Sequence, residues 1–233
     1  MKLGIMQPYF FPYIGYWQLM NAVDKYIVYD DVNFIKGGWI NRNRILLNGE
    51  VKYFNLPMLG ASPNKAINEV GVNNELHEIN KKLKLIEASY KKAPYFDAVY
   101  SIIEKSFACE KKNIAEFILN SFVLVNEYLG IETELILSST LNKDNSKRAQ
   151  DKVIDICKLL EADEYYNAIN GQSLYSKDEF EKNGIKLSFL CTKEIQYSQF
   201  DNAQFFENLS IIDVMMFNSK EEIQCMLNAF DII

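Results

Sequence analysis

The chain has 233 residues and a formal net charge of −6, from 25 basic and 31 acidic side chains. Hydrophobic residues make up 48% of it and charged residues 24%, which is ordinary for a globular protein. An acidic chain without a strongly basic block is a poor candidate for general nucleic-acid binding. No stretch reaches the roughly 20 apolar residues of a membrane span. Pro8 and Pro12 also argue against a secretory signal, so we expect a cytoplasmic protein.

The thiols and the imidazole are too few and too dispersed for common metal and nucleophile chemistry. Cys109, Cys157, Cys191 and Cys225 form no C-x-x-C pair, which is typical of free thiols in a reducing compartment. His77 is the one histidine. The sequence therefore predicts no zinc site, and no Ser-His-Asp or Cys-His mechanism unless His77 takes part.

The first thirty residues predict a βαβ unit. Lys2–Met6 is an apolar run typical of a strand, Gly15–Val23 reads as a helix, and Lys25–Tyr29 is a β-branched and aromatic run typical of a buried strand. Pro8 and Pro12 exclude regular structure between the first strand and the helix.

Later patterns are mostly helical. Phe34–Arg44 is expected to be a loop, and Asn48-Gly49 between two apolar runs predicts a hairpin with a type I′ turn. Further elements are expected as helices over 73–90, 95–108 and 111–129, a strand over 134–137, helices over 146–160 and 177–183, a strand over 185–190, and a terminal helix over 220–230. Tyr165-Tyr166 is assigned to no element, and Asn170-Gly171 reads as a turn. The pattern predicts an α/β protein, a single domain over residues 1–233, with a Rossmann-like βαβ start and a helical middle and C-terminal portion.

Polar and aromatic side chains are densest between the first strand and the first helix. Gln7, Tyr9, Tyr13 and Tyr16 lie there, and Gly15 would let a ligand approach the helix start, where free amides attract anions. The alternative is a proline-stiffened loop that packs its aromatic rings on the sheet.

A second group of candidate residues follows the second predicted strand. Asp30 and Asp31 stand at its C-terminal end, where open α/β sheets place ligand-binding groups. They could hold Mg²⁺ or accept a proton from an amine. Lys36 and the run Asn41, Arg42, Asn43 and Arg44 come next, and two guanidinium groups suit a phosphate or a carboxylate. The alternative is Asp–Arg salt bridging between neighbouring loops.

Two polar stretches in the second half of the chain complete the candidates. Tyr197, Gln199, Ser210 and Asp213 stand beside an apolar run, and Asp213 needs partners if it is buried. The interpretation we favour for Asp213 is a helix cap. The polar segment 138–148 could bind phosphate, but a solvated loop and helix start is the favoured interpretation.

The string MQPYFFPYIGYWQL, followed by YDDVNF and GWINRNRI, resembles the WbqC-like family. SYKKAPYF, YNAINGQSLY and LSIIDVMMFN agree with it later in the chain. Residues that recur in the family match here at Gln7, Tyr9, Tyr13, Gly15, Tyr16, Asp31, Arg42, Asn43, Arg44, Tyr197, Gln199, Ser210 and Asp213. The resemblance implies a place in bacterial O-antigen and other surface-polysaccharide gene clusters, and a role as a glycine transferase.

A more distant similarity concerns the start of the chain. A strand, a Pro-x-x-x-Gly loop, a helix and a strand also begin nucleotidylyltransferase-like enzymes, whose H-x-G-H motif falls where Tyr13-Ile14-Gly15-Tyr16 stands. Both histidines are replaced by tyrosines, which are not cationic near pH 7. The fold can be shared while the adenylyl-transfer chemistry differs.

The function predicted from these clusters is transfer of a glycyl or acyl group to a nucleotide-linked amino sugar. Tyr9, Tyr13 and Tyr16 would contact the sugar and base, the two arginines would hold phosphate, and Asp31 or Asp30 would remove a proton from the amine. An ATP-dependent carboxylate-amine ligase using Mg-ATP and a non-catalytic nucleotide-sugar-binding protein are the alternatives. The sequence leaves the cofactor and a homo-oligomeric state open.

Overall fold

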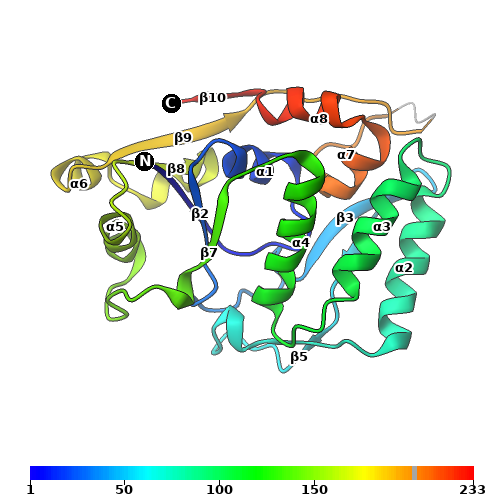
Figure 1. Cartoon of the computed structure of the whole chain (residues 1–233), viewed down its shortest axis with the longest axis horizontal. Helices are drawn as coiled ribbons and strands as arrows, with labels where there is room; N and C mark the ends of the chain where they lie inside the picture. The colour runs from blue at the N-terminus through cyan, green and yellow to red at the C-terminus, as the bar shows by residue number, and fades with distance from the viewer. Residues whose placement is uncertain (201–203) are drawn as a thin grey trace.

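A six-stranded sheet forms the centre of the protein (Figure 1). The structure, a computed structural model, describes residues 1–200 and 204–233. The strands stand in the order β10-β9-β8-β1-β2-β7. They are β1 (Lys2–Met6), β2 (Lys25–Val28), β7 (Glu134–Leu137), β8 (Glu164–Ala168), β9 (Lys186–Thr192) and β10 (Phe230–Ile232). All neighbours pair in parallel except β10, which runs antiparallel to β9.

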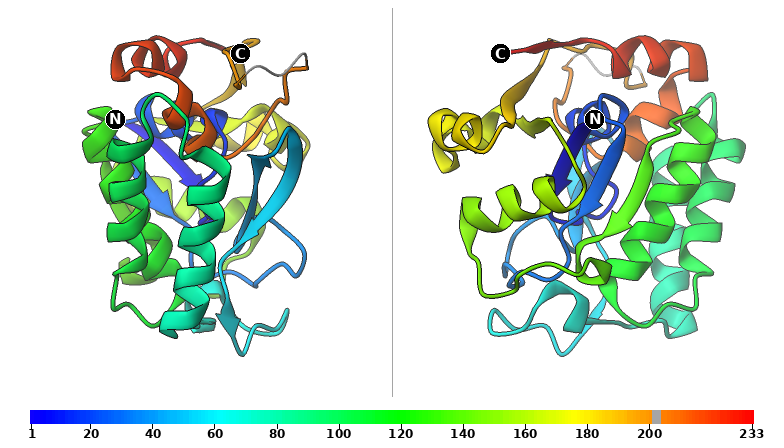
Figure 2. Two further views of the ribbon diagram at one scale, coloured as in Figure 1. Left: turned by 90° about the vertical axis from the view of Figure 1, so that its right-hand side faces the viewer. Right: turned by 60° about the vertical axis from the view of Figure 1, so that its left-hand side comes forward.

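Helices cover both faces of this sheet, as Figures 1 and 2 show. The helices are α1 (Ile14–Asn21), α2 (Leu76–Tyr90), α3 (Phe96–Phe107), α4 (Ile114–Leu129), α5 (Ala149–Leu159), α6 (Lys177–Lys182), α7 (Ile211–Phe217) and α8 (Lys220–Leu227). Alternate residues of one strand face opposite cores. On β2, Tyr26 and Val28 join the core under α1, α3, α4, α7 and α8, while Ile27 joins the core under α5 and α6.

A hairpin stands beside the main sheet (Figure 2). It consists of β3 (Arg42–Leu47) and β4 (Glu50–Asn55), which pair antiparallel. Asn48 and Gly49 have φ angles of 52° and 74°, as the predicted type I′ turn requires. A second short pair, β5 (Met58–Leu59) with β6 (Gly71–Val72), follows it. Short 3₁₀ turns complete the elements: η1 (Ile67–Glu69), η2 (Ser138–Thr140) and η3 (Ile169–Leu174).

The α/β class and the βαβ start predicted from the sequence are confirmed. β1, α1 and β2 follow one another, and β1 pairs in parallel with β2. The predicted helices match α2 to α6 and α8 within a few residues at their ends, and Gly130 ends α4 with a φ of 69°. Within residues 1–200 and 204–233, no helix has the length and apolarity needed to cross a membrane.

Two expectations about elements were wrong, and one strand was not predicted. The strand that was not predicted is β8, which contains Tyr165 and Tyr166 and lies next to β1. Phe230 begins β10 instead of ending the terminal helix. The expected loop over 34–44 already belongs to β3 from Arg42 on. β8 pairs with β1 and β10 with β9, which are distant in sequence, so their local patterns are weak. β3 instead pairs with the adjacent β4 across the hairpin.

Candidate functional site

A cavity of about 230 Å³ opens where the sheet changes its winding direction. From β1 the chain crosses to β2 on one side, while β8 joins β1 on the other. Loops leaving such a point diverge, and open α/β sheets bind their ligands in the crevice between them. The cavity is lined by Tyr9, Pro12, Tyr13, Trp39, Asn43, Arg44, Asn170 and Asn208.

The loop after β1 is held by hydrogen bonds to its backbone carbonyls. The buried Asn43 side chain donates through Nδ2 to the carbonyls of Phe10 at 3.1 Å and Phe11 at 2.9 Å. Ser210 Oγ donates to the same Phe11 carbonyl at 2.7 Å, and Trp17 Nε1 donates to the Pro12 carbonyl at 3.0 Å. Phe11 has a φ of 41°, which is strained for a non-glycine residue. These donors fix the loop that carries Tyr9 and Tyr13.

Arg44 is the cationic side chain at the cavity. Its Nη2 donates to the carbonyls of Glu207 at 3.2 Å and Asn208 at 3.1 Å, which holds that segment as a wall of the cavity. The Nε atom is buried and has no hydrogen-bond partner. Among the described residues, no carboxylate forms an ion pair with Arg44. An unpaired guanidinium in a cavity is suited to a phosphate or a carboxylate.

Aromatic and amide side chains complete the lining. Burial raises the pKa of both the Tyr9 and the Tyr13 hydroxyl, so both are neutral near pH 7 and can donate hydrogen bonds. Trp39 offers a ring face, and Asn170 and Asn208 offer amides that can bond hydroxyl groups. The arrangement can bind a small polar ligand with an anionic end.

Two residues predicted for the site lie inside the core instead. Tyr16 is buried, donates through its hydroxyl to the Gln7 carbonyl at 2.7 Å, and packs against other rings. At Gly15, a Cβ atom would lie 2.5 Å from the Tyr13 ring and 2.7 Å from Thr192 Oγ1. Gly15 therefore allows the close packing that positions Tyr13. The half-buried Gln7 does not line the cavity.

The segment before the hairpin divides its polar residues between different roles. Lys36 is exposed, and Asn41 forms hydrogen bonds with the backbone of Leu56. Arg42 donates through Nε to the Gly38 carbonyl at 3.1 Å and through Nη2 to the Gly37 carbonyl. Of the two arginines predicted to hold phosphate, Arg44 lines the cavity and Arg42 does not.

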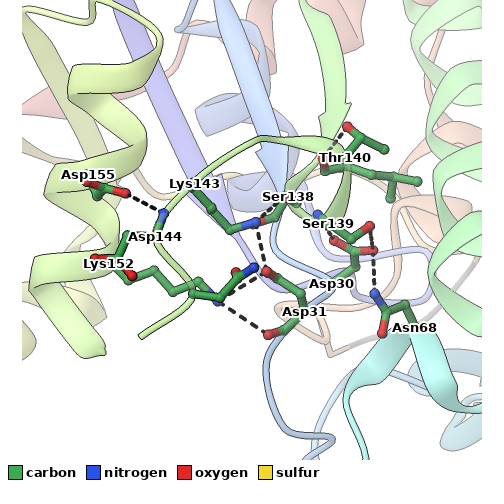
Figure 3. Close-up of polar contacts among 12 residues, drawn as sticks. Asp30, Asp31, Asn68, Ser138, Ser139, Thr140, Lys143, Asp144, Lys152 and Asp155 are labelled. Atoms are coloured by element: carbon green, nitrogen blue, oxygen red, sulfur yellow. Dashed lines mark hydrogen bonds and ion pairs between the residues drawn. The ribbon is translucent and has the colours of Figure 1, made fainter. Parts of the chain in front are cut away.

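Asp30 and Asp31 follow β2 as predicted, but their carboxylates are already paired (Figure 3). Asp31 Oδ2 lies 2.8 Å from Lys143 Nζ and 3.1 Å from Lys152 Nζ, and these lysine side chains are 1% and 7% exposed. Asp30 accepts hydrogen bonds from Ser139 N at 2.9 Å and Ser139 Oγ at 2.6 Å. Burial raises the pKa of Asp31, but the lysine hydrogen bonds outweigh it and leave the pKa below its usual value.

This pairing makes the two carboxylates unsuited to the roles expected for them. The lowered pKa of Asp31 makes it a weak base, and its Oδ2 faces two ammonium groups. Both Asp30 oxygens already accept hydrogen bonds from Ser139 or Asn68. The expected Asp–Arg salt bridges are replaced by Asp–Lys pairs. Among the described residues, no group of three or more His, Cys, Asp or Glu side chains could hold a metal ion.

The cluster around Asp213 is a buried hydrogen-bond network. Tyr197 Oη and Gln199 Nε2 donate to Asp213 Oδ1 at 2.7 Å and 3.0 Å, and Tyr90 Oη donates to Oδ2 at 2.8 Å. Ser210, and not Asp213, caps α7 by accepting from the backbone of Ile212. The expectation that Asp213 is the cap was therefore wrong.

This network is connected to the cavity. The Gln199 amide makes two hydrogen bonds with the backbone of Phe206, at 3.0 Å and 2.8 Å. The next two residues are those whose carbonyls bind Arg44. Ser210 binds the loop after β1. The N-terminal and Tyr197–Asp213 groups therefore meet in space, with Tyr197, Gln199, Ser210 and Asp213 behind the cavity wall.

Four lining residues were absent from the predicted site: Pro12, Trp39, Asn170 and Asn208. Trp39 stands inside the quoted string GWINRNRI, and Asn170 stands inside YNAINGQSLY. Asn170 was read as part of a turn because β8 before it had not been recognised. Asn208 had no signal in its local sequence, and its position depends on Arg44.

We predict that Asn43→Ala lowers the free energy of unfolding by about 1–3 kcal/mol, because it leaves a buried carbonyl without a donor. Asn41→Ala is the matched control, since the Asn41 amide makes one long hydrogen bond of 3.4 Å and is half-buried. Urea unfolding followed by circular dichroism measures both. Equal losses in the two variants would contradict the anchoring role.

We predict that Asp213 makes stability depend on pH. Burial raises its pKa to about 6, and the hydrogen bonds from Tyr197, Tyr90 and Gln199 oppose this shift. The folded state then holds the proton more tightly than the unfolded state. The resulting stability, roughly 3 kcal/mol, is full below pH 4 and lost as pH rises through 6.

Asp213→Asn should remove this contribution, so its free energy of unfolding should fall less than that of the wild type between pH 4 and 6. Urea titrations at pH 4, 5, 6 and 7 provide the comparison. Parallel profiles for the two proteins would show that Asp213 keeps an ordinary pKa.

Comparison with known proteins gives the chain a family. The sequence profile described as the WbqC-like protein family matches residues 7–225. The chain is 24% identical over 191 residues to "Uncharacterized protein Rv1507c" of Mycobacterium tuberculosis, an alignment that covers 81% of each protein. No solved structure matches it. The chain belongs to the WbqC-like protein family.

Proposed function

We propose that this protein is a transferase of bacterial surface-polysaccharide biosynthesis that places a glycyl or other acyl group on a nucleotide-linked amino sugar. The observation that carries the proposal is the Arg44 guanidinium, which has no carboxylate partner among the described residues, beside aromatic and amide side chains in the cavity. A sugar phosphate combines the groups that such a lining binds: a charged phosphate, hydroxyl groups and an apolar ring face.

Each part of the lining would have a separate task. Arg44 would hold the phosphate attached to the sugar. Asn170 and Asn208 would bond sugar hydroxyls, and Tyr13 would contact the ring from the loop after β1. The strained loop, held by hydrogen bonds to the carbonyls of Phe10, Phe11 and Pro12, would keep these groups in place before the ligand binds, which reduces the cost of ordering them.

The reaction would join the sugar amine to the acyl carbon while the leaving group of the donor departs and the amine loses a proton. None of the described residues that line the cavity is Asp, Glu, His or Cys. The proton would therefore pass to the leaving group, directly or through water and the Tyr13 hydroxyl. Holding amine and acyl carbon together can by itself supply a large part of the rate.

A non-catalytic nucleotide-sugar-binding protein of the same pathway is the second candidate. The same lining favours it, because a binding protein needs Arg44 and the aromatic rings but no general base. Turnover separates the two candidates: product formation from an amino-sugar nucleotide and an activated glycyl donor requires the transferase. Binding of the same sugar nucleotide without product in the presence of the donor would favour the binding protein.

We predict that Arg44→Ala weakens binding of a UDP-linked amino sugar about 10- to 100-fold, because a hydrogen-bonded phosphate loses its cation. Isothermal titration calorimetry measures the affinity. Lys36→Ala is the matched control, since it removes an exposed cation from the same segment without touching the cavity.

Arg44→Lys retains the positive charge and should recover part of the affinity that Arg44→Ala loses. Circular dichroism must show all three variants folded, since Arg44 also holds the carbonyls of Glu207 and Asn208. If Arg44→Ala and Lys36→Ala bind the sugar nucleotide equally well, phosphate recognition by Arg44 is excluded.

A further inference from the structure

Aromatic rings and guanidinium groups alternate on one face of the β3–β4 hairpin and the loop before it. The Arg42 guanidinium lies 4.7 Å from the Tyr53 ring centre and 5.8 Å from the Trp39 ring centre. The Arg44 guanidinium also lies 5.8 Å from the centre of the Trp39 ring. We call this set, Tyr53, Arg42, Trp39 and Arg44, the aromatic–arginine ladder.

The strand register explains why these side chains share a face. Arg44 pairs directly with Tyr53 across the hairpin, and residues opposite each other in an antiparallel pair point to the same side. Arg42 and Arg44 are two apart on β3, which also places them on one side. The loop carbonyls of Gly37 and Gly38 then fix Arg42 against the rings.

The ladder joins the cavity to solvent. Trp39 and Arg44 line the cavity, whereas Tyr53 does not. Tyr53 is 53% exposed and Trp39 is 39% exposed, so each has a ring surface open to a ligand. Neither arginine forms an ion pair with a carboxylate among the described residues. The ladder thus offers flat apolar surface and two cations that have no anionic partner in the part of the chain that the structure describes.

The size of the cavity indicates that a sugar nucleotide must extend beyond it. At about 230 Å³ it is smaller than the roughly 300–1,000 Å³ typical of pockets for drug-sized ligands. A sugar fits such a volume, and the remaining nucleotide would leave through an opening. Because Trp39 and Arg44 belong to both the cavity and the ladder, the ladder is the continuous surface available to it.

We propose that the aromatic–arginine ladder is a second subsite that binds the nucleoside diphosphate part of the ligand. Its base stacks on the exposed ring faces of Trp39 and Tyr53, and its two phosphates lie between Arg42 and Arg44. This subsite rests on the proposed function, because it places the sugar of the same ligand in the cavity. It adds the recognition of the base, which the cavity alone cannot provide.

The protein carries its own probe for this subsite. It has two tryptophans, of which Trp17 is fully buried and Trp39 is exposed. Titration with UDP should therefore change the fluorescence of Trp39, and Trp39→Phe should abolish the change. Inorganic pyrophosphate, which has two phosphates but no base, is the comparison ligand for UDP.

We predict that Tyr53→Ala weakens UDP binding about 5-fold or more, since stacking of one base on one aromatic ring contributes about 1–3 kcal/mol. Pyrophosphate affinity should stay the same in this variant, and Tyr53→Phe should keep the wild-type affinity for UDP. Lys52→Ala is the control on the same strand, because Lys52 is exposed and pairs with Glu50 outside the ladder. Calorimetry of each variant gives the affinities.

The outcomes separate this inference from the proposed function. If a UDP-linked amino sugar binds the wild type and Tyr53→Ala equally well, the ladder subsite is wrong and the proposed function stands. The same holds if a sugar 1-phosphate binds as tightly as the complete sugar nucleotide. If neither UDP nor any nucleotide-linked amino sugar binds the wild type, both proposals are overturned.

Discussion

The candidate site depends on the hydrogen bonds that hold the loop after β1. Asn43 and Ser210 come from distant parts of the chain, yet both donate to the carbonyl of Phe11. An unpaired buried carbonyl is costly, so these donors let the loop keep an unfavourable backbone conformation. The same bonds bring the hairpin, the loop and the start of α7 together. The cavity is the space that remains between these elements.

Charge is distributed unequally around the C-terminal edge of the sheet. After β2, Asp31 Oδ2 is paired with two buried lysines next to the core, while its Oδ1 has no hydrogen-bond partner in the described part of the chain. At the cavity, Arg44 binds only backbone carbonyls and keeps a buried N–H without a partner. The two sites differ in charge pairing: Asp31 lies between lysines, whereas no carboxylate pairs with Arg44 among the described residues. The Arg44 cation is therefore better suited to an anionic ligand than the carboxylates, which looked reactive in sequence, are to the role of a base.

The sequence predicted candidate residues more accurately than their roles. Tyr9, Tyr13 and Arg44 line the cavity, as their clustering suggested. Tyr16 belongs to the same cluster but is buried, because it lies within α1 and packs its ring against Tyr26 and Phe122, whereas Tyr13 precedes the helix. Asp31 was identified for its carboxylate, but its buried lysine partners are more than a hundred residues away. The chemical type of a side chain can be read from the sequence, whereas its hydrogen-bond and ion-pair partners depend on the tertiary structure.

The sequence by itself determined the α/β class, the βαβ start, the hairpin turn and the family, because these depend on short-range periodicity, turn residues and motif strings. Only the tertiary structure decided the position of β8 beside β1. That position creates the cavity where the sheet changes its winding direction, and it decides that Asn170 and Asn208 line it. Parallel strands pair with partners far along the chain, and no local pattern records which partner is chosen. The union of the N-terminal loop with the Asp213 network arose in the same way, through hydrogen bonds between segments about 200 residues apart.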